Sequence, residues 1–349
     1  MYYKFALKRI INGILIFVIL IFLYSALFNA QLEKTIYSQI DEQVRGELMA
    51  LNTDNMSPED ITNWTRQKKE SLYKTYNLDK SSFERIIVRA GSILTLQFGE
   101  SSIIKSSSGE RSVRDIVFEA VPRTLMLFLT AIAIDIFLGI LLGIKKAQKP
   151  GSTLDKSTSI GTMIVYGMPS WWLGMLMIMF FVYILGIFPS GGLHSTPPPD
   201  GGFAYFIDIL WHLSLPVITL VLLGFWGRAY LTRNIVLGTL QEDYVMAARA
   251  RGIAEKKVLY GHALRSSAPP IVTMSLLALL ASVGGNIIFE GIFSWPGMGN
   301  LYWVAVQQND IPVLMGNLAV TTGLYQAGLV LLDLIYGFLD PRIKVGGKA

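Results

Sequence analysis

Residues 10–28 read IINGILIFVILIFLYSALF, and this stretch decides the class of fold to which the chain belongs. It carries no charged side chain, and about 20 mostly apolar residues are what a helix needs to cross the hydrocarbon core of a bilayer. Lys4, Lys8 and Arg9 precede it, as they would precede a secretory signal. The apolar run is longer than the core of a usual signal, and no clean small-x-small cleavage site follows it. We therefore expect a retained first membrane-spanning helix.

Five further stretches, all C-terminal to this segment, have the length and apolarity of membrane spans. They cover residues 121–144, 160–185, 207–226, 270–293 and 313–338. Hydrophobic residues make up 52% of the chain and charged residues only 16%, against about 25% charged in soluble domains. The sequence predicts an all-α polytopic membrane protein with six transmembrane helices, embedded in a lipid bilayer.

The charge and residue counts exclude several classes of function. A net charge of +5 could suggest a nucleic-acid partner, but a membrane protein with basic cytoplasmic loops shows the same surplus, so we expect none. The chain has no cysteine, which excludes disulfides, thiolate metal sites and a cysteine nucleophile. His194, His212 and His262 share no ligand spacing, so no metal site is expected.

The distribution of Lys and Arg predicts the orientation of the chain, because short cytoplasmic loops carry the excess of these residues. Segments 186–206 and 294–312 contain neither. With six spans, both termini and the basic loops are expected to be cytoplasmic. The basic residues that follow the second, fourth and sixth spans are Lys145, Lys146, Lys149, Lys156, Arg228, Arg233, Arg249, Arg251, Lys256, Lys257, Arg265, Arg342, Lys344 and Lys348.

A polar insert, residues 31–97, separates the first two spans and is expected on the outside. Ser57-Pro58-Glu59-Asp60 is typical of a helix start, with a capping serine, proline at the first helical position and acids in the first turn. The helix is expected to reach about Asn77, and Gly46 is expected to break the chain before it. The insert is interpreted either as a covering domain or as a docking element.

The segment 228–270 is far more polar than its surroundings and carries most of the functional information. It reads RAYLTRNIVLGTLQEDYVMAARARGIAEKKVLYGHALRSSAPP. Two helical pieces are expected, one ending at Gly252 and one covering residues 254–264, because glycine commonly ends a helix. On composition alone, a basic loop that only enforces topology explains it equally well.

The order of residues in this segment favours a more specific interpretation. Tyr244-Val-Met-Ala-Ala-Arg-Ala-Arg-Gly252, followed by His262-Ala-Leu-Arg265, resembles the coupling loop of ABC importer permeases of the dipeptide, oligopeptide and nickel branch, B-type. The wider superfamily pattern is Glu-Ala-Ala, three residues, Gly, nine residues, Ile-x-Leu-Pro. Ala247, Ala248 and Gly252 match it, whereas Met246 replaces the Glu, and His262 and Arg265 stand at the Ile and Pro positions.

The resemblance covers about residues 1–30 and 95–345, and it does not explain the insert. It divides the chain into an N-terminal helix 1–30, an extracytoplasmic insert 31–97, and a five-helix permease core 98–349 with its coupling loop at 228–268. The further segments that carry the resemblance are Phe98-Gly-Glu-Ser101, Pro122-Arg-Thr-Leu125, Met168-Pro-Ser-Trp-Trp-Leu-Gly174, Leu215-Pro216, Arg228-Ala-Tyr-Leu-Thr-Arg233, Phe289-Glu-Gly-Ile-Phe-Ser-Trp-Pro-Gly-Met-Gly299, Asp333-Leu-Ile-Tyr336 and Asp340-Pro-Arg-Ile343.

The resemblance implies a type I ABC importer permease fold in a prokaryotic inner or plasma membrane. The implied partners are a sibling permease in a heterodimer, two ATPase subunits that bind ATP and Mg, and an extracytoplasmic substrate-binding protein. The chain has no phosphate-binding loop of the Gly-x-x-x-x-Gly-Lys type, so no catalysis and no cofactor are expected in it. The implied cargo is a di- or oligopeptide, with oligosaccharides or nickel chelates as the alternatives.

The residues expected to couple to the ATPase form a short helix, in which small alanines allow close approach and Tyr244 anchors the contact. They are Glu242, Asp243, Tyr244, Ala247, Ala248, Arg249, Arg251 and Gly252. Ionisable groups within spans are functional candidates by default, and a helix-to-helix hydrogen bond is the competing explanation. The candidate pathway or gate residues are Asp135, Glu290, Pro296, Gly297 and Asp333.

Proteins of other classes remain as alternatives. A secondary transporter would show inverted repeats and helices broken around a central site, and no repeat between the halves is evident. A sensor would need a cytoplasmic signalling domain, and an enzyme would need clustered catalytic side chains. A homo-oligomeric channel would leave the polar segment 228–270 without a purpose.

Overall fold

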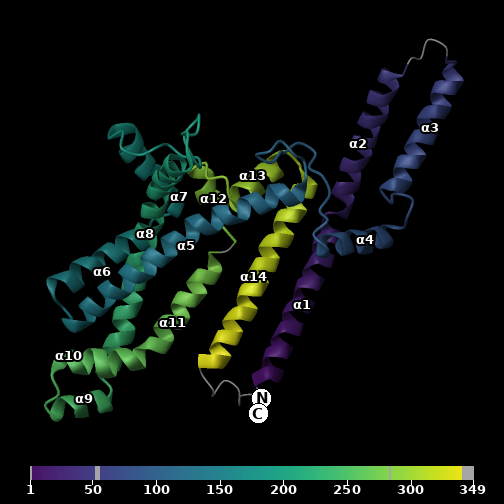
Figure 1. Cartoon of the computed structure of the whole chain (residues 1–349). Helices are drawn as coiled ribbons and strands as arrows, with labels where there is room; N and C mark the ends of the chain where they lie inside the picture. The colour runs from purple at the N-terminus through teal and green to yellow at the C-terminus, as the bar shows by residue number, and fades with distance from the viewer. Residues whose placement is uncertain (1, 52–55, 283, 340–349) are drawn as a thin grey trace. The chain divides into compact units, whose positions relative to one another are not determined.

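The computed structural model describes all residues except 1, 52–55, 283 and 340–349, so Asp340-Pro-Arg-Ile343 lies outside the described part (Figure 1). The described residues form helices and no β-strand, with one isolated bridge between Glu100 and Ser112. The all-α prediction is confirmed. The chain divides into two compact units. The first contains residues 1–118, 304–330 and 337–349, and the second residues 119–303 and 331–336. The domain limits at residues 30 and 97 stay a prediction.

Five helices are long and apolar enough to cross a membrane within the described ranges: 3–27, 113–148, 202–240, 255–281 and 311–335. A bent pair, 153–166 with 170–184, provides a sixth if it is counted as one span. The chain is therefore an all-α polytopic membrane protein, as its composition predicted.

The third predicted span is not one continuous helix. α6 (Thr153–Tyr166) and α7 (Ser170–Ile178), which continues as the π-helix η2 (Met179–Ile184), meet at a bend of 100°. Pro169 stands at the N-cap of α7 with an extended ψ of 135°. A proline disfavours helical backbone in the residue before it, here Met168, so the helix has to end there.

The fifth predicted span, 270–293, is also wrong in its limits. α11 (Leu264–Ala281) ends well before Phe293, and α12 (Ile287–Ile292) is a separate short helix. The side chain of Asn286 accepts a hydrogen bond from the Phe289 N–H at 2.9 Å, and Gly285 has a φ of +69°. A capping side chain and a left-handed glycine together explain why the chain turns here.

The first unit is built on α1 (Tyr2–Leu27), which is followed by α2 (Asn29–Ala50), α3 (Pro58–Thr75) and α4 (Ser82–Leu94). α3 starts at the predicted place, because Ser57 and Asp60 form a reciprocal capping box. α2 passes straight through Gly46, so the predicted break there is wrong. The first part of α14 (Ile311–Leu339) belongs to this unit, and Tyr24 hydrogen-bonds Thr322 at 3.1 Å.

The second unit contains most of α5 (Val113–Gln148), α8 (Gly202–Leu240), α11, α12 and the first half of α13 (Met298–Gln307). Its larger apolar cluster joins α5, α7, α8 and α12 through side chains such as Leu127, Leu215 and Phe289. Pro122 and Pro216 lie inside α5 and α8 without ending them. Neighbouring helices re-satisfy the backbone groups that a proline frees within a membrane bundle.

Candidate functional site: the α9–η3 knob and the polar pairs behind it

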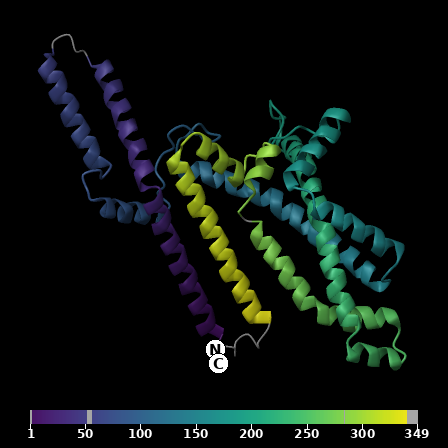
Figure 2. The same ribbon diagram turned by 180° about the vertical axis from the view of Figure 1, so that it is seen from behind.

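The polar segment begins later than the sequence indicated. α8 continues to Leu240, so Arg228 and Arg233 belong to this helix and not to a loop. The chain then turns at Gln241 and forms α9 (Asp243–Ala250), α10 (Glu255–Lys257) and the π-helix η3 (Val258–Ala263), which leads into α11. Figure 2 shows α9 and α10 as a small projection at one end of α8 and α11. We call residues 241–263 the knob.

Gly252 ends α9 in the way that the sequence predicted. Its φ is +76°, its N–H donates to the Arg249 carbonyl at 2.8 Å, and the Ile253 N–H donates to the Ala248 carbonyl at 3.3 Å. These two bonds define a Schellman motif, which satisfies carbonyls that the helix end leaves free. A Cβ at Gly252 would meet no atom within 4 Å. The requirement for glycine is therefore set by the left-handed backbone and not by space.

The two faces of α9 have different roles. Val245 and Ala248 are fully buried, whereas Tyr244, Ala247 and Arg251 are exposed and follow one another at i, i+3 and i+7, along one side of a helix. The buried pair enters an apolar cluster that joins the ends of four other elements. Its remaining members are Ile144 and Ala147 of α5, Val236 and Leu240 of α8, Val258, Leu259 and Ala263 of η3, and Ile271 of α11.

This arrangement corrects the expectation that Ala248 allows close approach of a partner. Its methyl group lies inside the chain's own cluster, and only Ala247 of the two alanines faces outward. Glu242 and Asp243 are exposed at the N-terminus of α9, where negative charge is favourable beside the free N–H groups of a helix.

Arg249 is bound within the knob. Its Nη1 donates to the carbonyl of Leu240 at 3.1 Å, and its Nε pairs with Oε1 of Glu255 at 2.8 Å. The guanidinium thus connects the last carbonyls of α8 with the first turn of α10. Arg249 therefore caps a carbonyl of its own chain. Arg251 is exposed.

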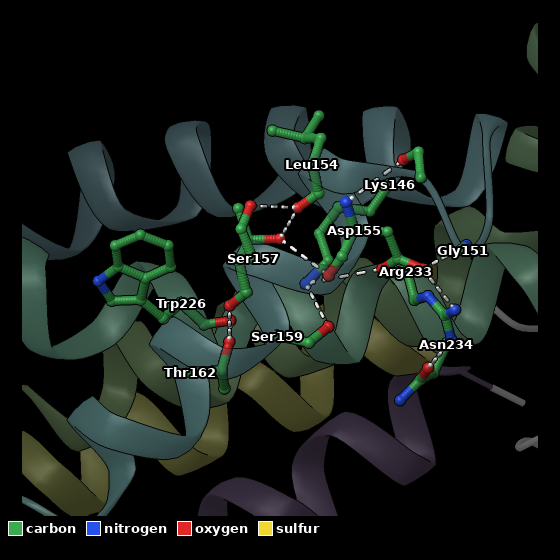
Figure 3. A network of polar contacts seen from close by, with 12 residues as sticks. Lys146, Gly151, Leu154, Asp155, Ser157, Ser159, Thr162, Trp226, Arg233 and Asn234 are labelled. Carbon is green, nitrogen blue, oxygen red and sulfur yellow. Dashed lines mark hydrogen bonds and ion pairs between the residues drawn. The ribbon is translucent and has the colours of Figure 1, made fainter.

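A network of charges lies next to the knob, where α5, α6 and α8 meet (Figure 3). Asp155 accepts hydrogen bonds from the Gly151 N–H at 3.0 Å and from Arg233 Nη2 at 2.8 Å. Lys146 is fully buried, with its Nζ 4.0 Å from Asp155 and 3.3 Å from the Ser159 hydroxyl. The sequence counted Lys146 and Arg233 only as loop charges, because pairing between distant helices leaves no local signal.

Asp135 is in contact with a neighbouring helix. Its Oδ2 accepts hydrogen bonds from Arg228 Nε at 2.9 Å and Nη2 at 2.6 Å, and both side chains are largely buried. Glycines allow this approach, since a Cβ at Gly224 would lie 3.0 Å from the Asp135 carboxyl carbon. The pair borders a cavity of about 380 Å³ that Ser282 and Asn286 also line. Asp135 therefore combines a helix-to-helix bond with a place on a cavity wall.

Glu290, one of the candidate pathway or gate residues, lies in the interior of the second unit. It is fully buried, and its carboxylate accepts hydrogen bonds from the Thr124 hydroxyl at 3.0 Å, the Gly299 N–H at 2.8 Å and the Asn300 N–H at 3.0 Å. Thr124 in turn accepts from the Met298 N–H at 2.7 Å. The carboxylate therefore ties the N-terminus of α13 to α5, and it acts as an internal cap.

The remaining pathway candidates have different surroundings. Gly297 lies against this cluster, because a Cβ there would collide with Thr124 and Glu290. Pro296 precedes it beside the buried Trp295, whose Nε1 donates to the Arg123 carbonyl at 2.9 Å. Asp333 is partly buried on α14, far along the sequence from the Asp135–Arg228 pair and from the Glu290 cluster. Among the described residues, no group of three or more His, Cys, Asp or Glu could hold a metal ion.

The sequence is similar to that of a large set of membrane transport components. Residues 135–345 match the family described as binding-protein-dependent transport system inner membrane component. The oligopeptide transport system permease protein AppB of Bacillus subtilis (strain 168) is 30% identical, over 79% of this chain and 85% of that protein. The di/tripeptide transport system permease protein DppB of Pseudomonas aeruginosa (strain UCBPP-PA14) is 30% identical, over 79% and 84%.

Two further similarities extend this comparison. The peptidoglycan transport system permease protein YejB of Agrobacterium fabrum (strain C58 / ATCC 33970) is 33% identical, over 78% of this chain and 75% of that protein. A chain of the MetNI methionine ABC transporter in an inward-facing conformation is 18% identical, with a TM-score of 0.45, over 62% of this chain and 96% of that chain.

Proposed function

Because the chain belongs to the family of binding-protein-dependent transport system inner membrane components, we propose that it is the first membrane subunit of an ATP-driven importer for peptides. It would form the translocation pathway together with a sibling permease. Two ATPase subunits would bind ATP and Mg, an extracytoplasmic binding protein would deliver the cargo, and this chain would itself catalyse no reaction. Both termini would be cytoplasmic in the inner or plasma membrane of a prokaryotic cell.

The observation that carries this proposal is the construction of the knob. α9 presents Tyr244, Ala247 and Arg251 outward, while Val245 and Ala248 fasten it to the ends of α5, α8 and α11. A tyrosine, a small residue and an arginine along one helix face form a suitable contact for a groove, since tyrosine and arginine are enriched in interface hot spots.

The same cluster supplies a mechanical connection. Closely packed interiors transmit displacement, because their atoms have few voids to move into. A push on α9 by a closing pair of ATPases would therefore reach α5, α8 and α11 together. The Asp155 network would keep α6 in step with them, because it joins α6 to α5 and α8 through Lys146 and Arg233.

The docking role can be tested by cross-linking through a single introduced cysteine, because the chain has no native cysteine that would also react. Ala247→Cys carries a short thiol-reactive photocross-linker, and Thr62→Cys on α3 is the matched exposed control. We expect the first to capture a protein with Walker motifs in native membranes and the second to capture none. If neither position captures an ATPase, and the purified chain is reproducibly a homo-oligomer, then a channel or a secondary transporter becomes the better interpretation.

The cargo is proposed from the relatives, whose names specify oligopeptide, di/tripeptide and peptidoglycan transport. Uptake of labelled di-, tri- and pentapeptides should fall in a strain that lacks this chain and return when the chain is restored. Uptake of labelled oligosaccharides and nickel chelates is measured in the same strains. Unchanged peptide uptake without the chain, together with loss of oligosaccharide or nickel-chelate uptake, would replace the peptide assignment while leaving the importer role in place.

A further inference from the structure

The first unit contains an amphipathic helix whose apolar side is only partly covered. α4 (Ser82–Leu94) carries Phe83, Ile86, Ile87, Ala90, Ile93 and Leu94 within one broad arc of its circumference, given the 3.6-residue turn. Glu84, Arg85, Arg89 and Ser92 occupy the remaining, mainly polar side, together with Val88. The arc is wider than the surface that packs against the rest of the unit.

The polar side of α4 is held by the start of α2. Arg85 Nε pairs with Oε1 of Glu33 at 2.8 Å, and Arg89 Nη1 donates to Oδ1 of Asn29 at 2.7 Å. Asn29 and Glu33 lie in the first polar turns after the apolar α1. The polar side of α4 therefore faces the start of α2, which follows the membrane-spanning helix α1 and lies beyond the hydrocarbon core.

One edge of the apolar arc packs on the last turns of α1. Ala90 and Ile93 are buried in a cluster with Ile21, and Tyr24 and Phe28 pack against the same cluster. α4 runs crosswise to α1 at the α1–α2 junction, as both views show (Figures 1 and 2). Its depth is therefore that of the outer end of the first membrane span, where the sequence changes from apolar to polar.

The other edge of the arc is not covered by any of the residues that the structure describes. Phe83 is 72% exposed and Ile87 is 42% exposed, and the two residues lie one turn apart on the same side. At the same depth α1 also leaves Ile19, Leu23 and Leu27 exposed, by 55%, 51% and 68%. These side chains lie on the side of α1 away from Ile21, Tyr24 and Phe28, and they belong to a membrane-spanning helix, so lipid is present at the depth of α4.

We propose that α4 lies in the outer interface of the bilayer, with Phe83 and Ile87 among the upper acyl chains and its polar side toward the water. A helix with one apolar and one charged side at the boundary of headgroups and acyl chains is the arrangement that suits such a lipid surface. The helix would anchor the base of the α2–α3 hairpin at the membrane surface. The inference rests on the membrane-spanning nature of α1, and it does not depend on the transported cargo.

The test measures the depth of single side chains, which a chain without native cysteine allows. Phe83→Cys, Ile87→Cys and Glu84→Cys are nitroxide-labelled in the full-length chain, reconstituted in phosphatidylethanolamine–phosphatidylglycerol liposomes. Ile14→Cys on α1 and Thr62→Cys on α3 give the lipid and water references. Collision rates are then measured with oxygen, which concentrates in lipid, and with a neutral nickel chelate, which stays in water.

We expect labels at residues 83 and 87 to favour oxygen over nickel several-fold, as the label at residue 14 does. The label at residue 84, which lies about 100° around the helix from Phe83 and outside the apolar arc, should behave like that at residue 62. Nickel-accessible labels at 83 and 87 would overturn the proposal, because the apolar edge would then face water. Labels that are immobile and shielded from both reagents would also overturn it, because a protein partner and not lipid would then cover α4.

Discussion

At the scale of single residues, the surroundings of a side chain decide its role more than its type does. Ala247 and Ala248 are adjacent and chemically identical, yet one is exposed and the other is fully buried among the ends of four other helical elements. The expectation that both face a partner is wrong for Ala248. The same reasoning separates Arg251, which is exposed, from Arg249, which holds the Leu240 carbonyl and Glu255.

We predict that Ala248→Glu and Ala247→Glu fail in different ways. A carboxylate at residue 248 would be buried without a partner, which costs on the order of 3–5 kcal/mol, so the amount of folded protein should fall. At the exposed residue 247 the effect on stability should stay within about 0.5 kcal/mol, while uptake is lost. Thermal unfolding of the detergent-solubilised protein, measured beside peptide uptake, distinguishes the two.

Equal stability of these two variants would contradict the assignment of the α9 faces. Normal uptake by Ala247→Glu would count against the docking role and leave the fold unaffected.

At the scale of elements, helices are joined by polar contacts that their own sequences do not reveal. Asp135 of α5 and Arg228 of α8 form a largely buried pair. Asp155 connects α6 with Lys146 of α5 and Arg233 of α8. The hydropathy of the sequence predicted where the membrane-spanning helices lie, but it missed the bend before Pro169 and the break after Ala281. It also assigned Arg228 and Arg233 to a loop.

We predict strong coupling between the members of the Asp135–Arg228 pair. Asp135→Leu should leave Arg228 buried and unpaired, at a cost on the order of 3–5 kcal/mol, whereas a buried pair replaced on both sides by apolar residues is often nearly neutral. The double variant Asp135→Leu with Arg228→Met should therefore unfold at a higher temperature than Asp135→Leu alone. If the two single effects simply add, the pair does not hold α5 and α8 together.

The helices α3 and α4 should respond to acid at their first turns. The Ser57 hydroxyl and N–H lower the pKa of Asp60, and the Ser81 N–H and hydroxyl lower the pKa of Glu84. Because these pKa values are depressed in the folded state, the caps stabilise the helices above the ordinary carboxyl pKa, about 4–4.5, and this stabilisation is lost as the pH falls through the lowered values.

Amide hydrogen exchange of residues 59–61 and 82–85, corrected for the intrinsic rate, should show weaker protection at pH 3 than at pH 7. The matched control Ser57→Ala removes the α3 cap, and it should abolish the pH effect at residues 59–61 while sparing residues 82–85. An unchanged response at residues 59–61 in this variant would mean that the capping box is not its cause.

At the scale of the whole molecule, the orientation is predicted from the distribution of charge, and a direct test is available. We predict that a membrane-impermeant maleimide labels Thr62→Cys in intact cells but labels Ala254→Cys in the knob only after permeabilisation. The reason is that short basic loops are retained on the cytoplasmic side. The opposite labelling pattern would invert the orientation and remove the knob from any cytoplasmic ATPase.

The sequence by itself determined the class of fold, most of the spans, the helix start at Ser57 and the helix end at Gly252. These features depend on local properties: runs of apolar residues long enough for a bilayer, a capping side chain beside a proline, and a glycine that adopts a left-handed backbone. Gly46 shows the limit of local reasoning, because a glycine costs a helix interior only about 1 kcal/mol, and α2 continues through it.

The tertiary structure alone decided which side of α9 is free, which charges are paired and which acid is internal. Glu290 was one of the candidate pathway or gate residues, and three donors from Thr124, Gly299 and Asn300 enclose its carboxylate. From the sequence, Arg228 and Lys146 were counted as loop charges. In the structure they pair with Asp135 and Asp155, which lie on other helices. Such partners are far apart in sequence, and a buried charge is tolerated only where folding brings its partner within reach.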